Sequence, residues 1–169
     1  MYHAAIPTKH RMIDATDRSI LTILQQDART PNAEIARQVG MAPSATLERL
    51  RKLEERGVVR GYAARVCPEA VGLGLLAFVF VRTEEGGGAP ETQRRLTALP
   101  EVVELHHVAG EDCFLAKVRA ADTNDLGRLL REGIGAIETV RSTRTTIVLE
   151  TVKEDAPLPL RDPAEATRG

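Results

Sequence analysis

The chain has 169 residues, of which 43% are hydrophobic and 28% charged. That length suffices for one sizeable domain or two small ones, and the apolar share is ordinary for a folded protein. No apolar run approaches the ~20 residues that span a bilayer, and the N-terminus lacks the apolar stretch of a signal peptide, so we expect a cytoplasmic protein. The two cysteines, Cys67 and Cys113, lack the paired spacing of a metal site and argue against a disulfide framework.

The net charge of −1 is divided unevenly along the chain. Residues 1–65 contain 11 Lys and Arg against 7 Asp and Glu, a balance of +4, whereas residues 66–169 contain 12 against 17, a balance of −5. A basic front half is typical of a DNA-binding domain, although a difference of a few charges also arises by chance. Aromatic residues make up only 3% of the chain, which argues against recognition of RNA or single-stranded DNA by base stacking.

Three helices are predicted in the basic half. The first runs from a cap at Asp14 to about Asp27. Asn32 is the expected cap of the second helix, which Gly40 ends, because glycine adopts the left-handed conformation that terminates a helix. Pro43 suits the first turn of the third helix, where its missing N–H is not needed. Five apolar residues are expected to form the core of these helices: Leu24, Ile35, Val39, Leu50 and Leu53.

The second and third helices have the layout of a helix-turn-helix, whose second helix enters the major groove of double-stranded DNA. Small or polar residues at the start of the third helix can approach base edges: Ser44, Ala45 and Thr46. Charged residues complete the predicted DNA-binding surface: Glu48, Arg49, Arg51 and Lys52. The cationic ones are expected to neutralise phosphates, which supplies most of the affinity. The alternative is a solvated basic helix in a purely structural domain.

Residues 58–66 connect this helical region to the rest of the chain. Their apolar residues alternate loosely with Arg60 and Arg65, which predicts a strand or two, the wing of a winged helix-turn-helix. We therefore assign residues 13–63 to a DNA-binding domain. The stretch 64–74 contains Pro68 and two glycines and is the expected hinge.

The remaining chain predicts a second domain at residues 75–153, which makes the fold class α+β. A continuous apolar run at 75–82 indicates a strand covered on both faces. A helix from Pro90, strands at 102–108 and 113–119, a helix capped by Asp122 and a last strand within 139–152 follow. The order β-α-β-β-α-β is that of the ferredoxin-like fold. Residues 154–169 are proline-rich and polar, so we expect a disordered tail.

Five segments of the chain resemble the feast/famine regulators, the Lrp/AsnC family of transcription factors: DATDRSILTILQQDAR, NAEIARQVGM, LERLRKLEERGVVRGY, VVELHHVAGEDCFLAKV and TRTTIVLETVK. They occur in the family's order and spacing over roughly residues 13–153. The resemblance implies a winged DNA-binding head, a hinge and a ferredoxin-like domain that dimerises and binds small effectors, often amino acids. It also implies that homodimers assemble further, into tetramers, octamers or open helices.

Three positions depart from the family's pattern. Ala42 stands where a capping serine is common, so Ser44 is an alternative cap that would start the third helix two residues later. Cys113 stands where members that sense amino acids often have an aspartate, with Asp112 one place earlier. The usual Leu-Pro-Gly-Val before the last strand is replaced by residues 137–140, Ile-Glu-Thr-Val. The last two departures bear on the identity of the effector and not on the fold.

The turn before the third strand of the second domain is the candidate effector site. Gly110 can expose backbone N–H groups to a ligand carboxylate, and an acidic neighbour can hold an amino group. Threonines of the last strand, from a neighbouring subunit, would complete the pocket. The predicted site consists of Ala109, Gly110, Glu111, Asp112, Thr143, Thr145 and Thr146. The alternative is an ordinary turn with solvated acids.

Other chemistries find little support in the sequence. Adjacent strand residues such as His106 and His107 point to opposite faces, which disfavours a shared metal, and the Gly86–Gly88 loop lacks the Lys-Ser/Thr of a phosphate-binding loop. We expect no metal, no other cofactor and no enzymatic activity. Two rivals remain: an enzyme similar to the sirohaem decarboxylases, which share this two-domain layout, and a ligand sensor whose head no longer binds DNA. The concentration of basic residues on the third helix favours DNA binding.

Overall fold

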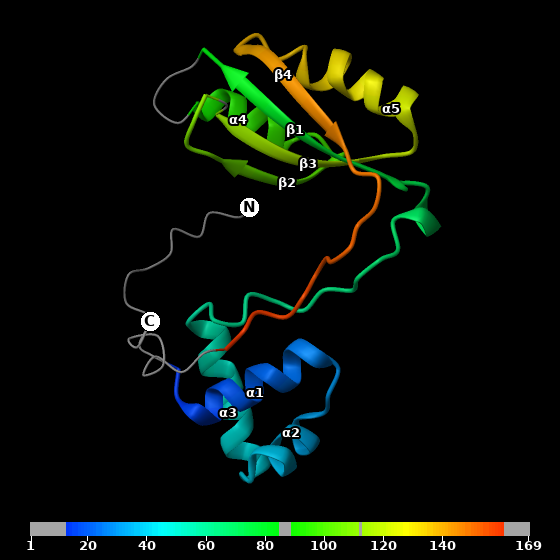
Figure 1. Cartoon of the computed structure of the whole chain (residues 1–169). Helices are drawn as coiled ribbons and strands as arrows, with labels where there is room; N and C mark the ends of the chain where they lie inside the picture. The colour runs from blue at the N-terminus through cyan, green and yellow to red at the C-terminus, as the bar shows by residue number, and fades with distance from the viewer. Residues whose placement is uncertain (1–12, 85–88, 112, 161–169) are drawn as a thin grey trace, which may run out of the picture. The chain divides into compact units, whose positions relative to one another are not determined.

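The computed structural model describes residues 13–84, 89–111 and 113–160 (Figure 1). Residues 1–12, the Gly86–Gly88 loop with Glu85, Asp112 and residues 161–169 at the end of the expected tail lie outside these ranges. The described chain forms two compact units: a helical unit of residues 13–64 with 153–160, and a sheet unit of residues 65–152. None of the described helices is long and apolar enough to cross a membrane.

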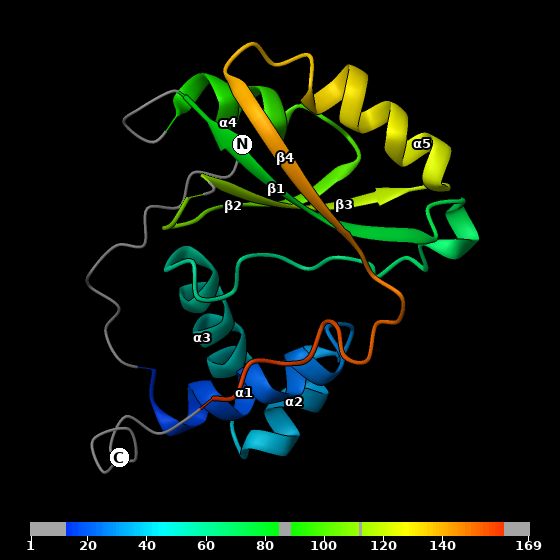
Figure 2. The same cartoon turned by 45° about the horizontal axis from the view of Figure 1, so that its top comes forward.

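The helical unit contains α1 (Ala15–Gln26), α2 (Asn32–Val39) and α3 (Pro43–Glu55), as expected (Figure 2). Asp14 caps α1 in a reciprocal capping box with Asp17. Gly40 ends α2 with φ +68, a conformation that glycine adopts without strain. The core of the unit consists of Ile20, Leu21, Ile35 and Leu53, and the predicted core residues Leu24 and Val39 pack against it while half-buried.

The expected cap of α2 is wrong, and the alternative later start of α3 does not occur. Pro31 occupies the cap position of α2, and Asn32 lies inside the helix because its side-chain amide instead donates to the Pro43 carbonyl, at 2.9 Å. The third helix begins at Pro43 with Ala42 as its cap, so Ser44 does not delay it. Neither helix has a side-chain cap, and the first turns rely on backbone bonds such as Thr46 N–H to the Ala42 carbonyl, 3.0 Å.

The structure has no strand in residues 58–66, where the sequence predicts the wing. The N–H groups of Val58 and Val59 donate to the carbonyl of Leu53, at 2.9 and 3.1 Å, so they finish α3 and are not available for a ladder. The residues from Arg60 to Val66 are exposed and irregular. A strand needs a hydrogen-bonding partner, and no strand is described elsewhere in the helical unit.

The C-terminal segment returns to the helical unit, as residues 154–160 lie against α1 (Figure 2). The side chain of Gln25 accepts a hydrogen bond from the Leu158 N–H at 2.7 Å and donates one to the Leu158 carbonyl at 3.1 Å. Leu160 packs against the helical core. This part of the predicted disordered tail is therefore held in place by two contacts. Leu160 supplies the apolar side chain, and Leu158, which lies between two prolines, supplies the N–H and carbonyl that bond to Gln25.

The sheet unit has the expected βαββαβ order: β1 (Leu75–Thr83), α4 (Pro90–Thr97), β2 (Val102–His107), β3 (Phe114–Ala120), α5 (Thr123–Arg128) and β4 (Val140–Ile147). The four strands form one antiparallel sheet in the order β2-β3-β1-β4. Asp122 caps α5 by accepting from the N–H groups of Asn124 and Asp125, as expected. This order, with two helices between strands, is the ferredoxin-like arrangement.

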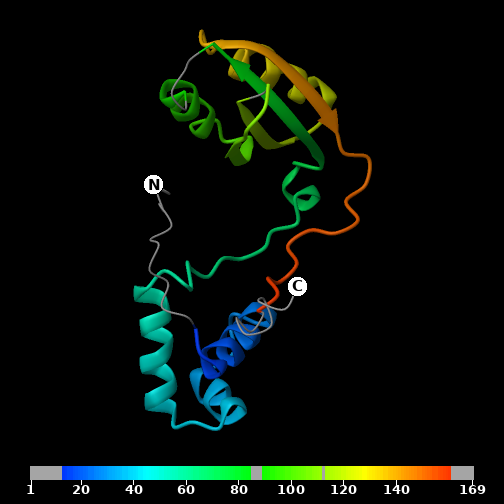
Figure 3. The ribbon, with the colours of Figure 1, turned by 60° about the vertical axis from the view of Figure 1, so that its left-hand side comes forward.

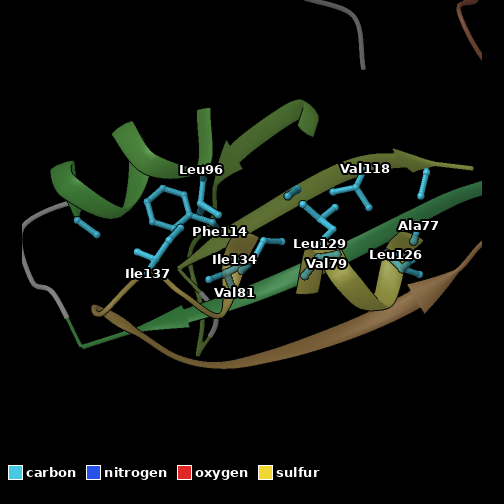
Figure 4. Packing of buried hydrophobic residues seen from close by; sticks show 13 residues of the cluster. Ala77, Val79, Val81, Leu96, Phe114, Val118, Leu126, Leu129, Ile134 and Ile137 are labelled. Atoms are coloured by element: carbon cyan, nitrogen blue, oxygen red, sulfur yellow. The ribbon is translucent and has the colours of Figure 1, made fainter. Parts of the chain in front are cut away.

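Both helices of the sheet unit cover the same face of the sheet (Figure 3). The core between them is formed by alternate strand residues, such as Val79 and Val81 of β1 and Phe114 of β3, together with Leu96 of α4 and Ile134 after α5 (Figure 4). All five are at most 1% exposed. The alternation places the other strand residues on the opposite face, which we call the open face.

The open face is only half-buried in the single chain. Phe78 and Phe80 of β1 lie on it beside Lys117 and Leu115 of β3, and all four are partly exposed. The Arg144 guanidinium of β4 lies over the Phe80 ring, 3.9 Å from its centroid. The sequence predicts that both faces of β1 are covered, whereas the helices of the sheet unit cover only one of them.

The helix predicted after Asp122 continues beyond α5 as the turn Leu129–Ile134, whose π-helical form was not predicted. It ends with the Gly135 N–H donating to the Leu130 carbonyl, five residues back, at 2.9 Å. A Cβ on Gly135 would lie 2.7 Å from that carbonyl oxygen and 3.0 Å from the Arg131 carbonyl oxygen. This turn therefore depends on glycine because of close backbone contact.

We expect Gly135→Ala to lower the free energy of unfolding by about 1–3 kcal/mol, since the backbone must shift to admit a methyl group. Gly127→Ala in α5 is the matched control: its Cβ would meet only the mobile end of Arg131, at 3.1 Å, and helix propensity favours alanine by about 0.5–1 kcal/mol. Urea unfolding followed by circular dichroism measures both. Equal effects of the two substitutions would contradict this account.

Candidate functional site

The two sides of α3 differ in what they contact. Thr46 and Leu53 are at most 1% exposed and belong to the interior of the helical unit. Ser44, Glu48 and Arg51 lie on the opposite side, because residues three and four apart share a helix face, and all three are exposed. The helix thus presents one polar side to solvent.

The structure places two of the predicted DNA-contacting residues away from this exposed side. Thr46 is fully buried and its hydroxyl donates to the Ala42 carbonyl at 3.2 Å, so it cannot approach a base edge. The Arg49 guanidinium binds the carboxylates of Asp14 and Asp17 in α1, at 2.6 and 2.8 Å. The prediction for Thr46 rested on its nearness to the helix start and that for Arg49 on its charge, and neither feature distinguishes the buried side of the helix from the exposed one.

The other predicted residues are together on the exposed side: Ser44, Ala45, Glu48, Arg51 and Lys52. Lys52 pairs with Glu48 at 3.3 Å, but both side chains are more than half exposed, and such a pair is weak and screened by salt. Among the described residues Arg51 makes no ion pair. The α3 surface therefore offers cationic groups that a phosphate can bind at little cost.

Two contacts that hold α3 were not predicted. The Asn32 amide bonded to the Pro43 carbonyl joins the starts of α2 and α3 across the turn. The Tyr62 hydroxyl donates to Glu54 at 2.9 Å, and burial followed by this acidic partner raises the pKa of Tyr62 to about 12. Nothing in the sequence pattern signals either pair, because their members are 11 and 8 residues apart and follow no helical or strand spacing.

The predicted effector turn is anchored at its ends and exposed in its middle. The Val108 N–H donates to the Cys113 carbonyl at 3.0 Å, and the Cys113 N–H donates to the Val81 carbonyl of β1 at 2.9 Å. Gly110 has φ +136, which strains any other residue. Within the described chain, the N–H groups of residues 109–111 donate to no main-chain carbonyl. Asp112 lies outside the described residues.

The three predicted threonines of β4 do not share one face of the sheet. Thr143 and Thr145 pair with Val81 and Val79, on the face covered by helices, whereas Thr146 pairs with Phe78 on the open face. One pocket on a single protomer therefore cannot use all three. Thr143 lies level with Phe114, at the end of the sheet where the turn is, two strands away from it.

A network of three other threonines was missed. The Thr83 hydroxyl donates to the Thr139 carbonyl at 2.8 Å, and the hydroxyls of Thr92 and Thr139 lie 2.5 Å apart. Thr92 is fully buried in α4, so the network joins β1, α4 and the chain entering β4. Thr139 stands in the segment that departs from the usual Leu-Pro-Gly-Val, and its hydroxyl gives that segment bonds that glycine cannot make.

The two adjacent histidines lie on different faces, as expected. His106 is 3.5 Å from the Glu104 carboxylate on the open face, whereas the His107 ring packs on Phe114 with centroids 5.2 Å apart. No group of three or more possible metal ligands occurs in the described residues. The described residues offer a cationic helix surface and an exposed stretch at 109–111 whose N–H groups donate to no described main-chain carbonyl, which suit phosphate and carboxylate binding.

Comparisons with known proteins match both units. The AsnC-type helix-turn-helix domain matches residues 13–54, and the Lrp/AsnC ligand binding domain matches residues 76–158. The HTH-type transcriptional regulator FL11 of Pyrococcus horikoshii is 38% identical over 149 residues, which cover 88% of this chain and 97% of that protein. The chain belongs to the Lrp/AsnC family. It is a transcriptional regulator of the Lrp/AsnC type, with a DNA-binding domain followed by a ligand-binding domain.

Other relatives and solved structures that resemble this chain lead to the same family. The leucine-responsive regulatory protein of Escherichia coli K12 is 36% identical over 146 residues, covering 84% of this chain and 88% of that protein. A transcriptional regulator from Neisseria meningitidis in complex with L-Met superposes with a TM-score of 0.82 at 33% identity, over 88% and 97% of the two chains. A feast or famine regulatory protein from M. tuberculosis complexed with L-methionine gives 0.79 at 39% identity, over 85% and 97%.

Proposed function

We propose that this Lrp/AsnC regulator binds double-stranded DNA through the exposed side of α3, as a homodimer whose DNA affinity responds to an amino acid. Residues 13–63 would form the DNA-binding domain, 64–74 the hinge, and 75–153 the domain for effector binding and oligomerisation, acting in the cytoplasm. The observation that carries the proposal is the polar side of α3, where Ser44, Glu48, Arg51 and Lys52 are exposed together.

The proposed DNA contacts divide into two kinds. Arg51 and Lys52 would bind phosphates and release counterions, which supplies affinity without sequence preference. Ser44 and Ala45 at the start of α3 are small enough for base edges to approach them in the major groove. Two such heads on a two-fold dimer would read half-sites about one DNA turn apart, roughly 34 Å.

We expect Arg51→Glu combined with Lys52→Glu to abolish retardation of a duplex taken from the chain's own upstream region. Two cations are lost and two like charges then face the phosphates, so binding should fail at any salt concentration. An electrophoretic mobility shift measured from low to high salt tests this, because attraction to phosphates is strongest at low salt and any residual binding would appear there.

The matched control is Arg94→Glu with Arg95→Glu, an adjacent basic pair on α4 of the sheet unit. It changes the net charge by the same amount and should leave the DNA affinity nearly unchanged. If both double variants lose DNA binding equally, the net charge of the protein and not the exposed side of α3 determines the DNA affinity. If the unaltered chain retards no duplex at any salt concentration, DNA binding itself is refuted.

The open face supports the proposed homodimer. The unbroken apolar run of β1 fits a strand covered on both sides, but within the sheet unit helices cover only one side. Phe78, Phe80 and Leu115 remain half-buried on the other side. A second copy placed on this face would bury them and leave the Arg144 stack on Phe80 at the interface.

We expect Phe80→Glu to shift the chain from dimers or larger assemblies to monomers, since a carboxylate replaces an apolar ring at the proposed interface. Leu149→Glu is the control, because Leu149 is 99% exposed beyond the end of β4 and its replacement should not change the assembly. Analytical ultracentrifugation measures the mass, and circular dichroism checks the fold. A Phe80→Glu chain that keeps the assembly of the unaltered chain would refute this interface.

An amino acid is the proposed effector because two similar structures contain L-methionine and because, within the described chain, the N–H groups of residues 109–111 donate to no main-chain carbonyl. The ligand's carboxylate would accept from the turn, and Glu111 would bind its amino group. Thr143 of a neighbouring subunit lies at the corresponding end of the sheet and would close the site. The effector can change the DNA affinity only if it binds the form of the assembly that binds DNA well and the form that binds DNA poorly with different affinities.

We expect L-methionine, or another of the twenty amino acids, to raise the melting temperature, because a ligand that prefers the native state stabilises it by about 2.7 kcal/mol at a hundredfold excess over Kd. Glu111→Gln should reduce this shift, whereas Glu150→Gln, an exposed acid outside the turn, should not. The absence of any shift across all twenty amino acids would refute the proposed class of effector.

We further propose that the chain is not an enzyme of the sirohaem decarboxylase type. Its relatives are named transcriptional regulators, and the cations that such an enzyme would need around a large pocket are instead concentrated on α3.

A further inference from the structure

We infer that Arg49 acts as a positioning residue, which sets α3 against α1 for DNA binding, and that it does not contact the DNA. The inference rests on the proposed DNA-binding function. One guanidinium nitrogen, Nη1, lies 2.6 Å from Asp14 Oδ2 and 2.8 Å from Asp17 Oδ1. Both carboxylates belong to the start of α1, so the contact joins the first helix of the head to the helix that reads DNA.

The two carboxylates are held in place by the backbone. The Asp17 N–H donates to Asp14 Oδ1 at 2.8 Å, and the Asp14 N–H points to Asp17 Oδ2 at 3.4 Å. These bonds form the capping box of α1. The Asp17 N–H and then the Arg49 side chain lower the pKa of the Asp14 carboxyl, and both acids raise the pKa of Arg49. Arg49 therefore binds a preorganised anionic site.

The position of Arg49 on α3 explains why it meets α1. Arg49 is three residues after the buried Thr46 and four residues before the buried Leu53. It therefore lies next to the side of α3 that packs into the helical unit. Arg51 is two residues away from both Arg49 and Leu53 and is therefore on the other side. The two arginines are close in sequence but serve different surfaces.

A phosphate would bind Arg49 poorly in this setting. It would have to displace two carboxylates, one of which, Asp17, has only 9% of its side chain exposed. Removing its partner would leave a buried negative charge without compensation, which is strongly unfavourable. The neighbouring acids also cancel the charge of Arg49, so it adds little to the field that attracts DNA.

The positioning role and a phosphate-contacting role predict opposite effects for Asp17. If Arg49 contacts phosphate, Asp17→Asn removes a competing anion and releases the arginine, so the head should bind DNA more tightly. If Arg49 positions α3, Asp17→Asn loosens α3 and should weaken DNA binding, although the head becomes more positive. The sign of the change therefore separates the two roles.

The test measures binding of the full chain to a labelled 30-bp duplex of random sequence over a salt series, with four single variants. We expect Arg49→Gln and Asp17→Asn each to weaken binding several-fold, with the salt slope of Arg49→Gln equal to that of the unaltered chain. Arg51→Gln, the matched arginine control, should reduce the slope by about 0.9. Glu55→Gln, an exposed acid of α3, should bind as tightly as the unaltered chain or more tightly.

Thermal unfolding shows whether each variant is folded at the assay temperature. If Asp17→Asn is unfolded, the salt slope of Arg49→Gln alone decides between the two roles of Arg49. A slope loss in Arg49→Gln equal to that in Arg51→Gln overturns the inference and leaves DNA binding by α3 standing. Tighter binding by a folded Asp17→Asn chain overturns it as well. Failure of the unaltered chain to bind the duplex at low salt would refute the proposed function and this inference with it.

Discussion

The orientation of α3 is the constraint on which the DNA-binding half of this molecule depends. Thr46 and Leu53 are buried, so only one rotation of the helix about its axis is compatible with a packed head. Arg49 fixes the same rotation from the side through two carboxylates of α1, and the Asn32 amide fixes the start of the helix. Ser44, Glu48, Arg51 and Lys52 face solvent as a consequence. The proposed DNA-contacting surface is thus determined by the residues that the opposite side of the helix buries.

The sheet unit follows a similar logic. Its helices cover one face of the sheet, and the alternation of side chains along β1 leaves phenylalanines on the other. An apolar face of this kind favours a symmetric partner, and symmetry would bring two heads to one DNA duplex. The proposed effector turn and the threonine network lie at the same end of this sheet, because the Cys113 N–H bonds to Val81 and the Thr83 hydroxyl bonds to Thr139.

Most of the fold could be predicted from the sequence because it depends on periodicity. The helical and strand spacings, the cap at Asp14, the cap at Asp122 and the βαββαβ order were all expected and are present. Contacts between distant residues could not be predicted in this way. The guanidinium of Arg49 is a group that commonly binds phosphate, and only its distances to Asp14 and Asp17 show that it is already paired with two carboxylates. Two further features likewise depend on contacts and not on a local sequence pattern. They are the π-helical turn before Gly135 and the hydrogen bonds between Leu158 and Gln25.

The most direct test of the claim that the exposed side of α3 reads DNA is to map amide chemical shifts by NMR while duplex DNA is added to the full chain. We predict that the largest changes fall on residues 44–52, and that the exposed amides of α4, which is equally accessible and also carries arginines, change little. Changes centred on α4, on the open face of the sheet or on α1 alone would contradict the account.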